Sequence, residues 1–335
     1  MPVAAMAQSA SDFPVSSTTE SRDELSGITP QNYPRVDGSA STAFLGQLIA
    51  ARALNVPADI RRVDPVFPVG DAGGETVGIS RNGALPVRLV FPLQTPLDKV
   101  DELLKLIEQK GTHGGTHQAY QALAEGRADM ILVTRRPSAD ELSAARNRGM
   151  EFDVRQIALD AFVFIVNGDN PVPSLTLDQI RGIFSGSVRN WSEVGGGNGA
   201  IQPLARGRNS GSEELMKGMV MKDMTISRAQ DRPAAGTMED VVEQVKRMPD
   251  AIGYSDLFVQ YAGASGRGGR LVAVEGVLPS TSTLLDGSYP LAVPVYVVTR
   301  RDVRTDAPAA KLRDWLLMVD GQQVAAASGL VPYSR

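Results

Sequence analysis

The chain has 335 residues, enough for about two domains, and its 42% hydrophobic and 21% charged residues are typical of a globular protein. A formal net charge of −4 argues against a general nucleic-acid-binding protein, because such proteins carry a basic field. The chain has no cysteine, which excludes disulfides, thiolate metal sites and thiol catalysis. No apolar run approaches the ~18 residues of a membrane-spanning helix, so no membrane insertion is expected.

Residues 1–32 are predicted to form a leader outside the folded part. The segment is rich in small and polar residues, and Ala5-Met6-Ala7 precedes Gln8. Two interpretations remain open: the end of a cleaved secretory signal with an A-x-A site, or a flexible tether without further meaning.

Strand and helix patterns alternate along the rest of the chain. Strands are expected at 33–36, 86–91, 129–134, 160–167, 201–205, 251–256 and 290–300, and helices at 41–54, 95–111, 116–125, 138–149, 176–184, 211–220, 238–248 and 307–319. The alternation predicts an α/β fold with mostly parallel sheets, whereas 55–86 gives no clear assignment.

The helix at 95–111 has the clearest end signals. Thr95 is predicted to be its cap, with Pro96 at the first position and Asp98 closing a capping box. Gly111 is predicted to stop it.

In open α/β sheets, ligands bind where strands end and helices begin, because helix N-termini present unpaired N–H groups. Four such turns in this chain have the residues to hold an anion. The first contains Gly38, Ser39, Ala40 and Ser41, whose hydroxyls can donate to an oxyanion. A plain helix N-cap is the alternative interpretation.

The second turn is the glycine-rich stretch 110–120, with Thr112, His113 and Thr116 as candidate anion contacts. His113 and His117 are the chain's two histidines and are four residues apart. A stable metal site needs three or four ligands, so no metal and no cofactor are predicted.

The third turn brings Thr134 and Arg135 directly after a buried-looking strand, where arginine can clamp an anion or extend into solvent. The fourth turn contains Arg206, Ser210, Gly211 and Ser212. Ser210 and Glu213 fit a capping box, and an anion held by Arg206 and by the N–H groups of the helix start would explain the arginine and the glycine.

Motifs for catalysis are missing from the sequence. Neither histidine has an obvious orienting carboxylate, and no Gly-x-Gly-x-x-Gly or Walker-type sequence is present. No nucleophile and base can be paired, so an enzyme is not expected.

Several segments resemble the phosphate-binding proteins of high-affinity phosphate ABC transporters, a periplasmic-binding-protein-like family. The segment 163–196 is similar to the family's strand, Leu-Thr helix and Ile-Phe-Ser-Gly…Asn-Trp…Gly-Gly ending, and 251–254 and 289–335 are similar to its later motifs. The stretches 33–42 and 116–138 resemble a branch that opens with Asp-Gly-Ser.

The resemblance implies a type II periplasmic-binding-protein fold with two lobes that close on a ligand. The first lobe is expected to comprise 33–160 and 257–335, and the second 161–256. The family's Arg-x-x-x-Ser-Gly-Thr phosphate loop falls on the fourth turn, its first hydroxyl loop near Ser39 and Ser41, and its Gly-Ser-Ser-Gly-Gly loop on 111–115, which puts His113 at the binding serine.

In the best-known members of the family, an aspartate in the third turn accepts the proton of hydrogen phosphate. Here that turn contains Thr134 and Arg135, so the acceptor is missing unless Asp37 takes its place. Arginine at this place favours a more anionic or larger ligand.

The resemblance implies a monomeric periplasmic or extracellular receptor that binds inorganic phosphate or a related oxyanion and delivers it to an ABC permease. A sensor or interaction module with the same fold, or a receptor for another oxyanion or an organophosphate, is the alternative.

Overall fold

The computed structural model describes residues 24–62, 75–77, 87–207, 210–227, 238–256 and 268–333. Its strands are β1 (Val36–Gly38), β2 (Asp59–Arg62), β3 (Glu75–Val77), β4 (Val87–Pro92), β5 (Met130–Val133), β6 (Phe152–Asn167), β7 (Ser174–Leu175), β8 (Gln202–Pro203), β9 (Ala251–Asp256), β10 (Gly269–Val274), β11 (Ala292–Arg300) and β12 (Val331–Pro332). Its helices are α1 (Ala43–Ala53), α2 (Leu97–Lys110), α3 (Thr116–Ala124), α4 (Ala139–Arg146), α5 (Leu177–Ser185), α6 (Gly211–Leu215), α7 (Met238–Arg247), α9 (Thr281–Leu285), α10 (Pro308–Trp315) and α11 (Val319–Ala327), with the short helical segments η3 (Ala40–Thr42), η4 (Trp191–Val194) and η5 (Met216–Met221). Within these described ranges, no helix is both long and apolar enough to cross a membrane.

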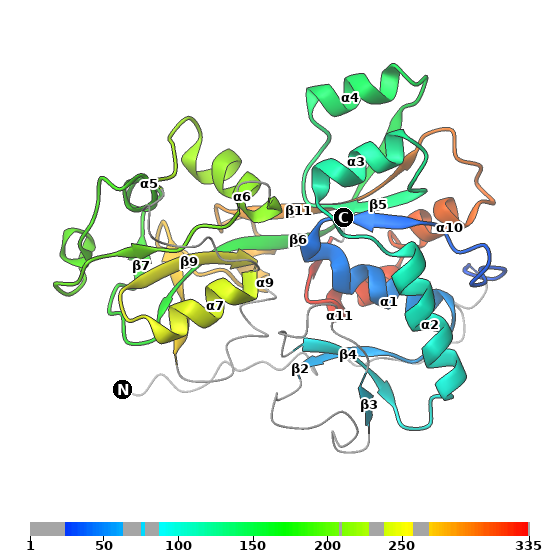
Figure 1. Ribbon diagram of the computed structural model, residues 1–335, viewed down its shortest axis with the longest axis horizontal. Helices are drawn as coiled ribbons and strands as arrows, with labels where there is room; N and C mark the ends of the chain where they lie inside the picture. The colour runs from blue at the N-terminus through cyan, green and yellow to red at the C-terminus, as the bar shows by residue number, and fades with distance from the viewer. Residues whose placement is uncertain are drawn as a thin grey trace.

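The long strands β6 and β11 connect the two halves of the molecule (Figure 1). The main sheet has the order β1-β5-β11-β6-β10-β7, β9 and β12 also pair with β6, and β8 pairs with β9. Helices α1 to α4, α10 and α11 lie around one half, and α5, α6, α7 and α9 lie around the other (Figure 1).

Most strands of each half share one direction. In one half, β7, β8, β9 and β10 all run against β6. In the other half, β1, β5 and β6 run in the same direction and β11 lies antiparallel between the last two. The predicted two-lobed α/β fold with mostly parallel strands is therefore confirmed, and the antiparallel neighbours occur along β6 and β11, the strands that connect the halves.

Buried apolar side chains change partners in the middle of β6. Ala161–Val166 belong to a cluster with side chains of α5, α7, β9 and β10, whereas Ile157 and Ala158 belong to a cluster with side chains of α1, α2, α10 and α11. The first cluster also contains Leu284 of α9, Val293 of β11 and Val331 of β12, whereas Val295 and Val297 of β11 belong to the second. β10 and α9 therefore pack with the 161–256 region, whereas 257–335 was expected to lie wholly in the first lobe.

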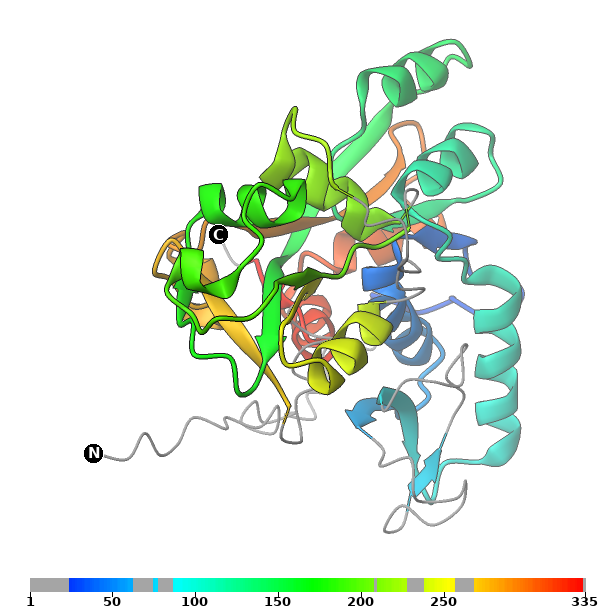
Figure 2. The same ribbon diagram turned by 60° about the vertical axis from the view of Figure 1, so that its left-hand side comes forward.

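A small antiparallel sheet of order β2-β4-β3 lies beside α2, as both views show (Figures 1 and 2). Leu89 and Phe91 of β4 share a buried cluster with Leu103 of α2, which attaches the sheet to the first half. The strand predicted at 86–91 is confirmed as β4. Within 55–86, only 55–62 and 75–77 are described.

The capping box predicted for the helix at 95–111 is wrong. The helix begins at Leu97, and Pro96 is the N-cap with an extended ψ of 129° and no side-chain cap bond. The Thr95 hydroxyl is buried without a hydrogen-bond partner in the described residues. Because Pro96 is extended, the chain turns into the helix one residue later and Thr95 points inward instead.

The structure describes residues 24–32, the last part of the predicted leader. Leu25 and Ile28 are buried in the cluster that contains α1 and α2, and the ammonium group of Lys110 donates to the carbonyl oxygens of Pro30 and Gln31. Residues 24–32 therefore pack on the fold, and Ala5–Gln8 lie outside the described residues. The strand expected at 33–36 begins at Val36 as β1.

Candidate functional site

A pocket lies at the boundary between the two buried clusters, where β6 crosses from one to the other and β9 ends. It is lined by Ser39 before η3, Ala40 and Ser41 of η3, Thr134 after β5, Asp160, Ala161 and Phe162 of β6, Arg206 before α6, Gly211, Ser212 and Leu215 of α6, Asp256 of β9 and Val293 of β11. Residues predicted from the first, third and fourth turns therefore meet in one place.

Arg206 supplies the positive charge of this lining. Its side chain is buried, with the residue only 8% exposed, and its Nε donates to the Ser212 hydroxyl at 3.2 Å. A planar guanidinium can donate two parallel hydrogen bonds to an oxyanion, and such charge-assisted bonds are stronger where water is excluded. Arg208 lies outside the described residues.

The start of α6 forms the wall beside Arg206. The Ser210 hydroxyl accepts a hydrogen bond from the Glu213 amide at 3.2 Å, so the predicted N-cap is confirmed. Ser210 itself is not among the residues that line the pocket. A side chain at Gly211 would meet no atom within 4 Å, so glycine there keeps the pocket open instead of relieving a clash.

The predicted capping box also requires a hydrogen bond from the Ser210 amide to the Glu213 carboxylate. This part of the prediction is wrong, because the Glu213 carboxylate has another partner. It accepts from the Tyr254 hydroxyl at 2.8 Å, and that hydroxyl accepts from the Arg206 amide at 2.9 Å. Ser210 instead donates its amide to the Gly207 carbonyl. The Glu213 side chain is fully buried, and burial raises the pKa of the Tyr254 hydroxyl. Tyr254 therefore fixes the backbone at Arg206 against α6.

The first turn presents two hydroxyls from the opposite half of the molecule. Ser39 precedes η3 but makes no side-chain cap bond, and its hydroxyl lies 3.1 Å from that of Ser41. Ser39 is therefore the N-cap of η3 by position, but its side chain makes no capping bond. Gly38 does not line the pocket: a Cβ there would lie 2.4 Å from the Leu132 carbonyl oxygen, so its glycine permits β1 and β5 to approach.

Residues of the second turn pack against the first turn, outside the pocket lining. Thr112 donates its amide to the Val36 carbonyl at 2.8 Å. The His113 ring lies against Gly38 and Gly46, because a Cβ at either glycine would be 2.9 Å from a ring nitrogen. Neither Thr112 nor His113 lines the pocket.

Asp37 is not the missing acceptor in the pocket. Its carboxylate accepts from the Gly38 amide at 2.7 Å and from the Gly114 amide, which holds the second turn to the end of β1. Burial raises the pKa of Asp37, and these hydrogen bonds offset part of that effect.

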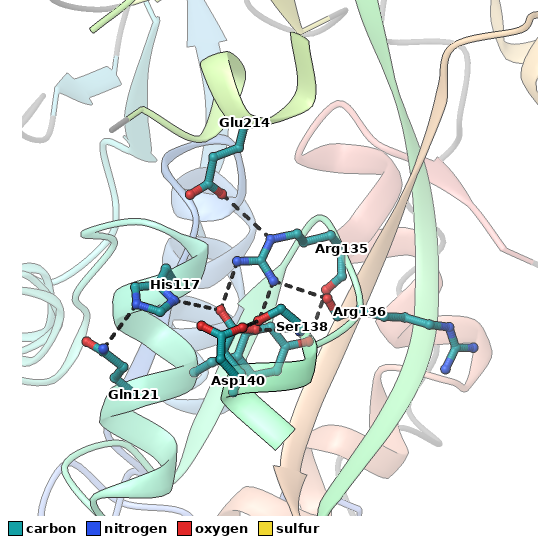
Figure 3. A network of polar contacts seen from close by, with 9 residues as sticks. His117, Gln121, Arg135, Arg136, Ser138, Asp140 and Glu214 are labelled. Carbon is teal, nitrogen blue, oxygen red and sulfur yellow. Dashed lines mark hydrogen bonds and ion pairs between the residues drawn. The ribbon is translucent and has the colours of Figure 1, made fainter. Parts of the chain in front are cut away.

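Arg135 of the third turn is held by a buried carboxylate (Figure 3). Its two terminal nitrogens lie 2.8 and 2.9 Å from the oxygens of Glu141, a bidentate ion pair. Glu141 also accepts from the Ser138 amide and lies 2.8 Å from Nδ1 of His117. Burial acts to raise the pKa of Glu141, but hydrogen bonding to these partners outweighs it and the pKa is lowered. Arg135 is therefore an internally paired cation.

Arg135 also reaches the opposite half of the molecule. Its Nε lies 3.6 Å from a carboxylate oxygen of Glu214 on α6. The side chains of Arg135 and Glu214 line a second pocket together with Thr116, Thr134 and Gly218. This pocket adjoins the first, because both are lined by Thr134, Gly211 and Leu215. Arg136 points away in Figure 3 and lies over the Tyr296 ring. Thr116 and Arg135 therefore line this adjoining pocket, which we call the mouth, and do not line the first pocket.

The two histidines have different surroundings. His117 contacts Glu141 through Nδ1 and Gln121 through Nε2, whereas His113 packs against glycines. Across the described part of the chain, no group of three or more His, Cys, Asp or Glu side chains could hold a metal ion.

The sequence-based prediction missed two carboxylates in the lining, Asp160 and Asp256. They are 5% and 7% exposed; Asp160 lies on β6, which connects the halves, and Asp256 is the last residue of β9. The sequence does contain a signal, because a carboxylate within or beside a buried apolar strand needs a polar partner. Phe162, Leu215 and Val293, also missed, resemble ordinary core residues in sequence.

Comparison with known proteins identifies the family. The sequence profile described as a PBP superfamily domain matches residues 105–317. Among curated relatives, the phosphate-binding protein PstS of Pseudomonas aeruginosa is 29% identical over 242 residues, covering 65% of this chain and 72% of that protein. Protein SphX of Synechococcus elongatus is 24% identical over 279 residues, covering 80% and 81%.

Solved structures show the same fold. An ABC-type phosphate transport receptor from Vibrio cholerae superposes with a TM-score of 0.62 at 17% identity, covering 89% of this chain and 99% of that one. PstS from Borrelia burgdorferi gives a TM-score of 0.53 at 16% identity, covering 90% and 98%. The resemblance found in the sequence is confirmed, and the chain belongs to the PBP superfamily of binding proteins.

Proposed function

We propose that this protein is an extracytoplasmic receptor that binds inorganic phosphate between two lobes and delivers it to an ABC permease. The observation that carries the proposal is the buried guanidinium of Arg206 in a pocket that also contains Ser39 and Ser41 from the other half. A curated relative is named phosphate-binding protein PstS, and a solved structure with the same fold is named an ABC-type phosphate transport receptor, which supports phosphate as the ligand.

The chemistry of the lining suits a tetrahedral oxyanion. Arginine provides charge and paired donors, and the hydroxyls of Ser39, Ser41 and Ser212 can each donate one hydrogen bond. Because these donors come from both halves, an anion that bridges them stabilises the closed arrangement over the open one.

We propose lobe boundaries that follow the buried clusters. One lobe comprises 33–160 and 294–333, and the other 161–293, with Val331 of β12 packed against the second lobe. The chain crosses after Asp160, which pairs with Val293, and before Pro294, which pairs with Leu159. The Arg135–Glu214 ion pair joins the lobes at the mouth of the pocket and favours closure. The protein acts as a monomer in the periplasm or outside the cell.

Isothermal titration of phosphate-free protein with inorganic phosphate tests the proposal. We expect tight binding with one site per chain, and an increase in the midpoint of thermal unfolding, because a ligand that binds the folded state stabilises it. The absence of both effects would contradict the proposal. Stronger binding of arsenate or of a phosphomonoester than of phosphate would assign the pocket to another oxyanion, and steady turnover of a phosphoester would make the protein an enzyme.

A further inference from the structure

The mouth is the larger of the two adjoining cavities. Its volume is about 160 Å³, whereas that of the first pocket is about 40 Å³. Thr134, Gly211 and Leu215 line both cavities, so the two are contiguous. A ligand held by Arg206 in the first pocket can therefore carry a substituent that extends past these residues into the mouth.

Two nearly buried hydroxyls line the mouth. Thr116 is 2% exposed and Thr134 is 6% exposed. Among the residues that the structure describes, neither hydroxyl has a hydrogen-bond partner. A buried hydroxyl without a partner costs free energy, so both hydroxyls are stabilised by a polar group that enters the mouth.

Glu214 provides an acceptor in the mouth. Its carboxylate oxygen lies 3.6 Å from Nε of Arg135, which is longer than a hydrogen bond, and the terminal nitrogens of Arg135 are already bound to Glu141. Because a carboxylate has about four acceptor positions, Glu214 can accept from a ligand hydroxyl and keep this ion pair.

The same carboxylate disfavours a second anionic group on the ligand. Such a group would lie against Glu214, whereas the charge of Arg135 is already offset by its bidentate pair with Glu141. Charges of the same sign repel, and the repulsion is stronger in a partly buried site than in water. A substituent in the mouth is therefore expected to be uncharged and to carry hydroxyls.

The second half of the molecule gives the mouth space and apolar surface. Leu215 and Met219 offer apolar side chains to the carbon chain of a substituent. Gly218 precedes Met219 in η5, and a Cβ there would meet no atom within 4 Å. Glycine weakens a helix and no clash requires it at this position, so its effect is to leave room in the mouth.

We propose that the mouth is a subsite for the organic part of a phosphomonoester, so that the protein binds phosphomonoesters of small, uncharged, hydroxylated alcohols in addition to inorganic phosphate. The phosphoryl group lies at Arg206, and the ester oxygen directs the alcohol into the mouth, where its hydroxyls contact Thr116 and Glu214. The inference rests on the proposed phosphate-binding function and adds a second class of ligand.

The test is titration calorimetry of phosphate-free protein with inorganic phosphate and with three esters that have been freed of inorganic phosphate. Glycerol 3-phosphate is the expected ligand, propyl phosphate has the same carbon chain without its hydroxyls, and 3-phosphoglycerate has a carboxylate in that chain. A second titration of glycerol 3-phosphate in saturating inorganic phosphate shows whether the two ligands compete for one pocket.

Two variants change the mouth alone. Gly218→Leu fills it, and Thr116→Val removes a hydroxyl while keeping the shape of the side chain. Gly197→Leu is the matched control for the first, because Gly197 is also exposed, a Cβ there would also meet no atom within 4 Å, and it lines neither pocket. Neither glycine has a positive φ, so leucine is compatible with both backbones.

For the unmodified protein, we expect glycerol 3-phosphate to bind with an affinity within about tenfold of that of inorganic phosphate, and to be displaced by it. Propyl phosphate and 3-phosphoglycerate bind at least about tenfold more weakly than glycerol 3-phosphate. Gly218→Leu and Thr116→Val weaken glycerol 3-phosphate binding by about tenfold and about fivefold, and they change inorganic phosphate binding by less than about twofold. Gly197→Leu changes neither.

Binding of inorganic phosphate without binding of glycerol 3-phosphate, a result that needs no variant, would overturn the inference and leave the proposed function in place. Equal affinities for propyl phosphate and glycerol 3-phosphate would also overturn it, because the hydroxyls would then have no partners in the mouth. So would equal losses of both ligands in Gly218→Leu. No binding of inorganic phosphate would instead contradict the proposed function.

Discussion

Arg206 and Arg135 lie in corresponding places in the two halves of the molecule, and the structure uses them differently. Each arginine lies in the loop that follows a strand, and each has its backbone held by a tyrosine hydroxyl. Arg135 forms a bidentate pair with Glu141 and lies at the mouth of the pocket. Arg206 lies in the lining of the pocket, and its Nε donates a hydrogen bond to the Ser212 hydroxyl.

The difference comes from the helix that follows each arginine. In α4 the carboxylate at the third position, Glu141, accepts the Ser138 amide and turns toward Arg135. In α6 the corresponding carboxylate, Glu213, is directed to the hydroxyl of Tyr254. In the described contacts, Arg135 is therefore paired with the carboxylate of the helix that follows it, whereas the corresponding carboxylate of α6 accepts from Tyr254.

Replacing each arginine by glutamine gives the largest expected difference between the two regions. Arg206→Gln removes charge-assisted donors from a buried site, which costs roughly 2–5 kcal/mol and weakens phosphate binding on the order of 100-fold. Arg135→Gln changes the affinity only a few-fold. Calorimetric titration of both variants measures the difference, and similar losses in the two would show that both arginines contact the anion.

The two tyrosines sharpen the same comparison through stability. Tyr254→Phe leaves a buried amide at Arg206 and a buried carboxylate at Glu213 without their shared partner, which costs about 1–3 kcal/mol of unfolding free energy. Tyr120→Phe removes one hydrogen bond to the Arg135 carbonyl and costs less. Urea unfolding of the phosphate-free proteins measures both. We expect weaker phosphate binding only for Tyr254→Phe, and an equal effect on binding by Tyr120→Phe would contradict the assignment.

Acidic pH should lower the unfolding free energy that ionised Glu141 contributes through its pairing with Arg135. The pKa of Glu141 is lowered in the folded protein, so its ionised form contributes stability above the unfolded-state pKa of about 4.3. That contribution is lost as the pH falls through the lower, folded-state pKa. The stability difference between the unmodified protein and Glu141→Gln should be constant above about pH 5.5 and shrink at lower pH. A difference that grows toward acid pH would contradict the pairing.

The smallest effect is expected at the ion pair between the halves. Arg135 and Glu214 are 3.6 Å apart and their side chains are 30% and 39% exposed, so the pair is worth about 0.2–1 kcal/mol. Glu214→Gln should weaken phosphate binding by up to about fivefold at low salt and less at high salt. Lys99→Gln, which breaks an exposed pair on α2 away from the pocket, serves as the control. An effect of Glu214→Gln that does not change with salt would contradict an ionic contribution.

Much of the fold could be predicted from the sequence because its elements carry strong local signals. The strand at 160–167, the helix at 116–125 and the cap at Ser210 were predicted from periodicity and capping residues and are present in the structure. The start of α2 at Leu97 could not be predicted, because it depends on the extended conformation of Pro96 rather than on residue type.

Residues of the site could be predicted where a single turn of the chain lines the pocket. They could not be predicted where the lining side chains come from strands that are far apart in the sequence. Ser39, Arg206 and Ser212 belong to turns with evident donors. Asp160 and Asp256 join the pocket only because β6 and β9 pair, with Phe162 opposite Asp256, and that register is set by tertiary packing. The role of Arg135 depended in the same way on where Glu141 points.

A crystal structure of the protein grown with saturating inorganic phosphate tests the role of Arg206 most directly. We predict a tetrahedral anion within hydrogen-bond distance of the Arg206 guanidinium and of hydroxyls from η3, with Arg135 still paired to Glu141. An anion bound by Arg135 in place of Glu141, or a pocket without an anion at Arg206, would contradict the assignment of this pocket as the phosphate site.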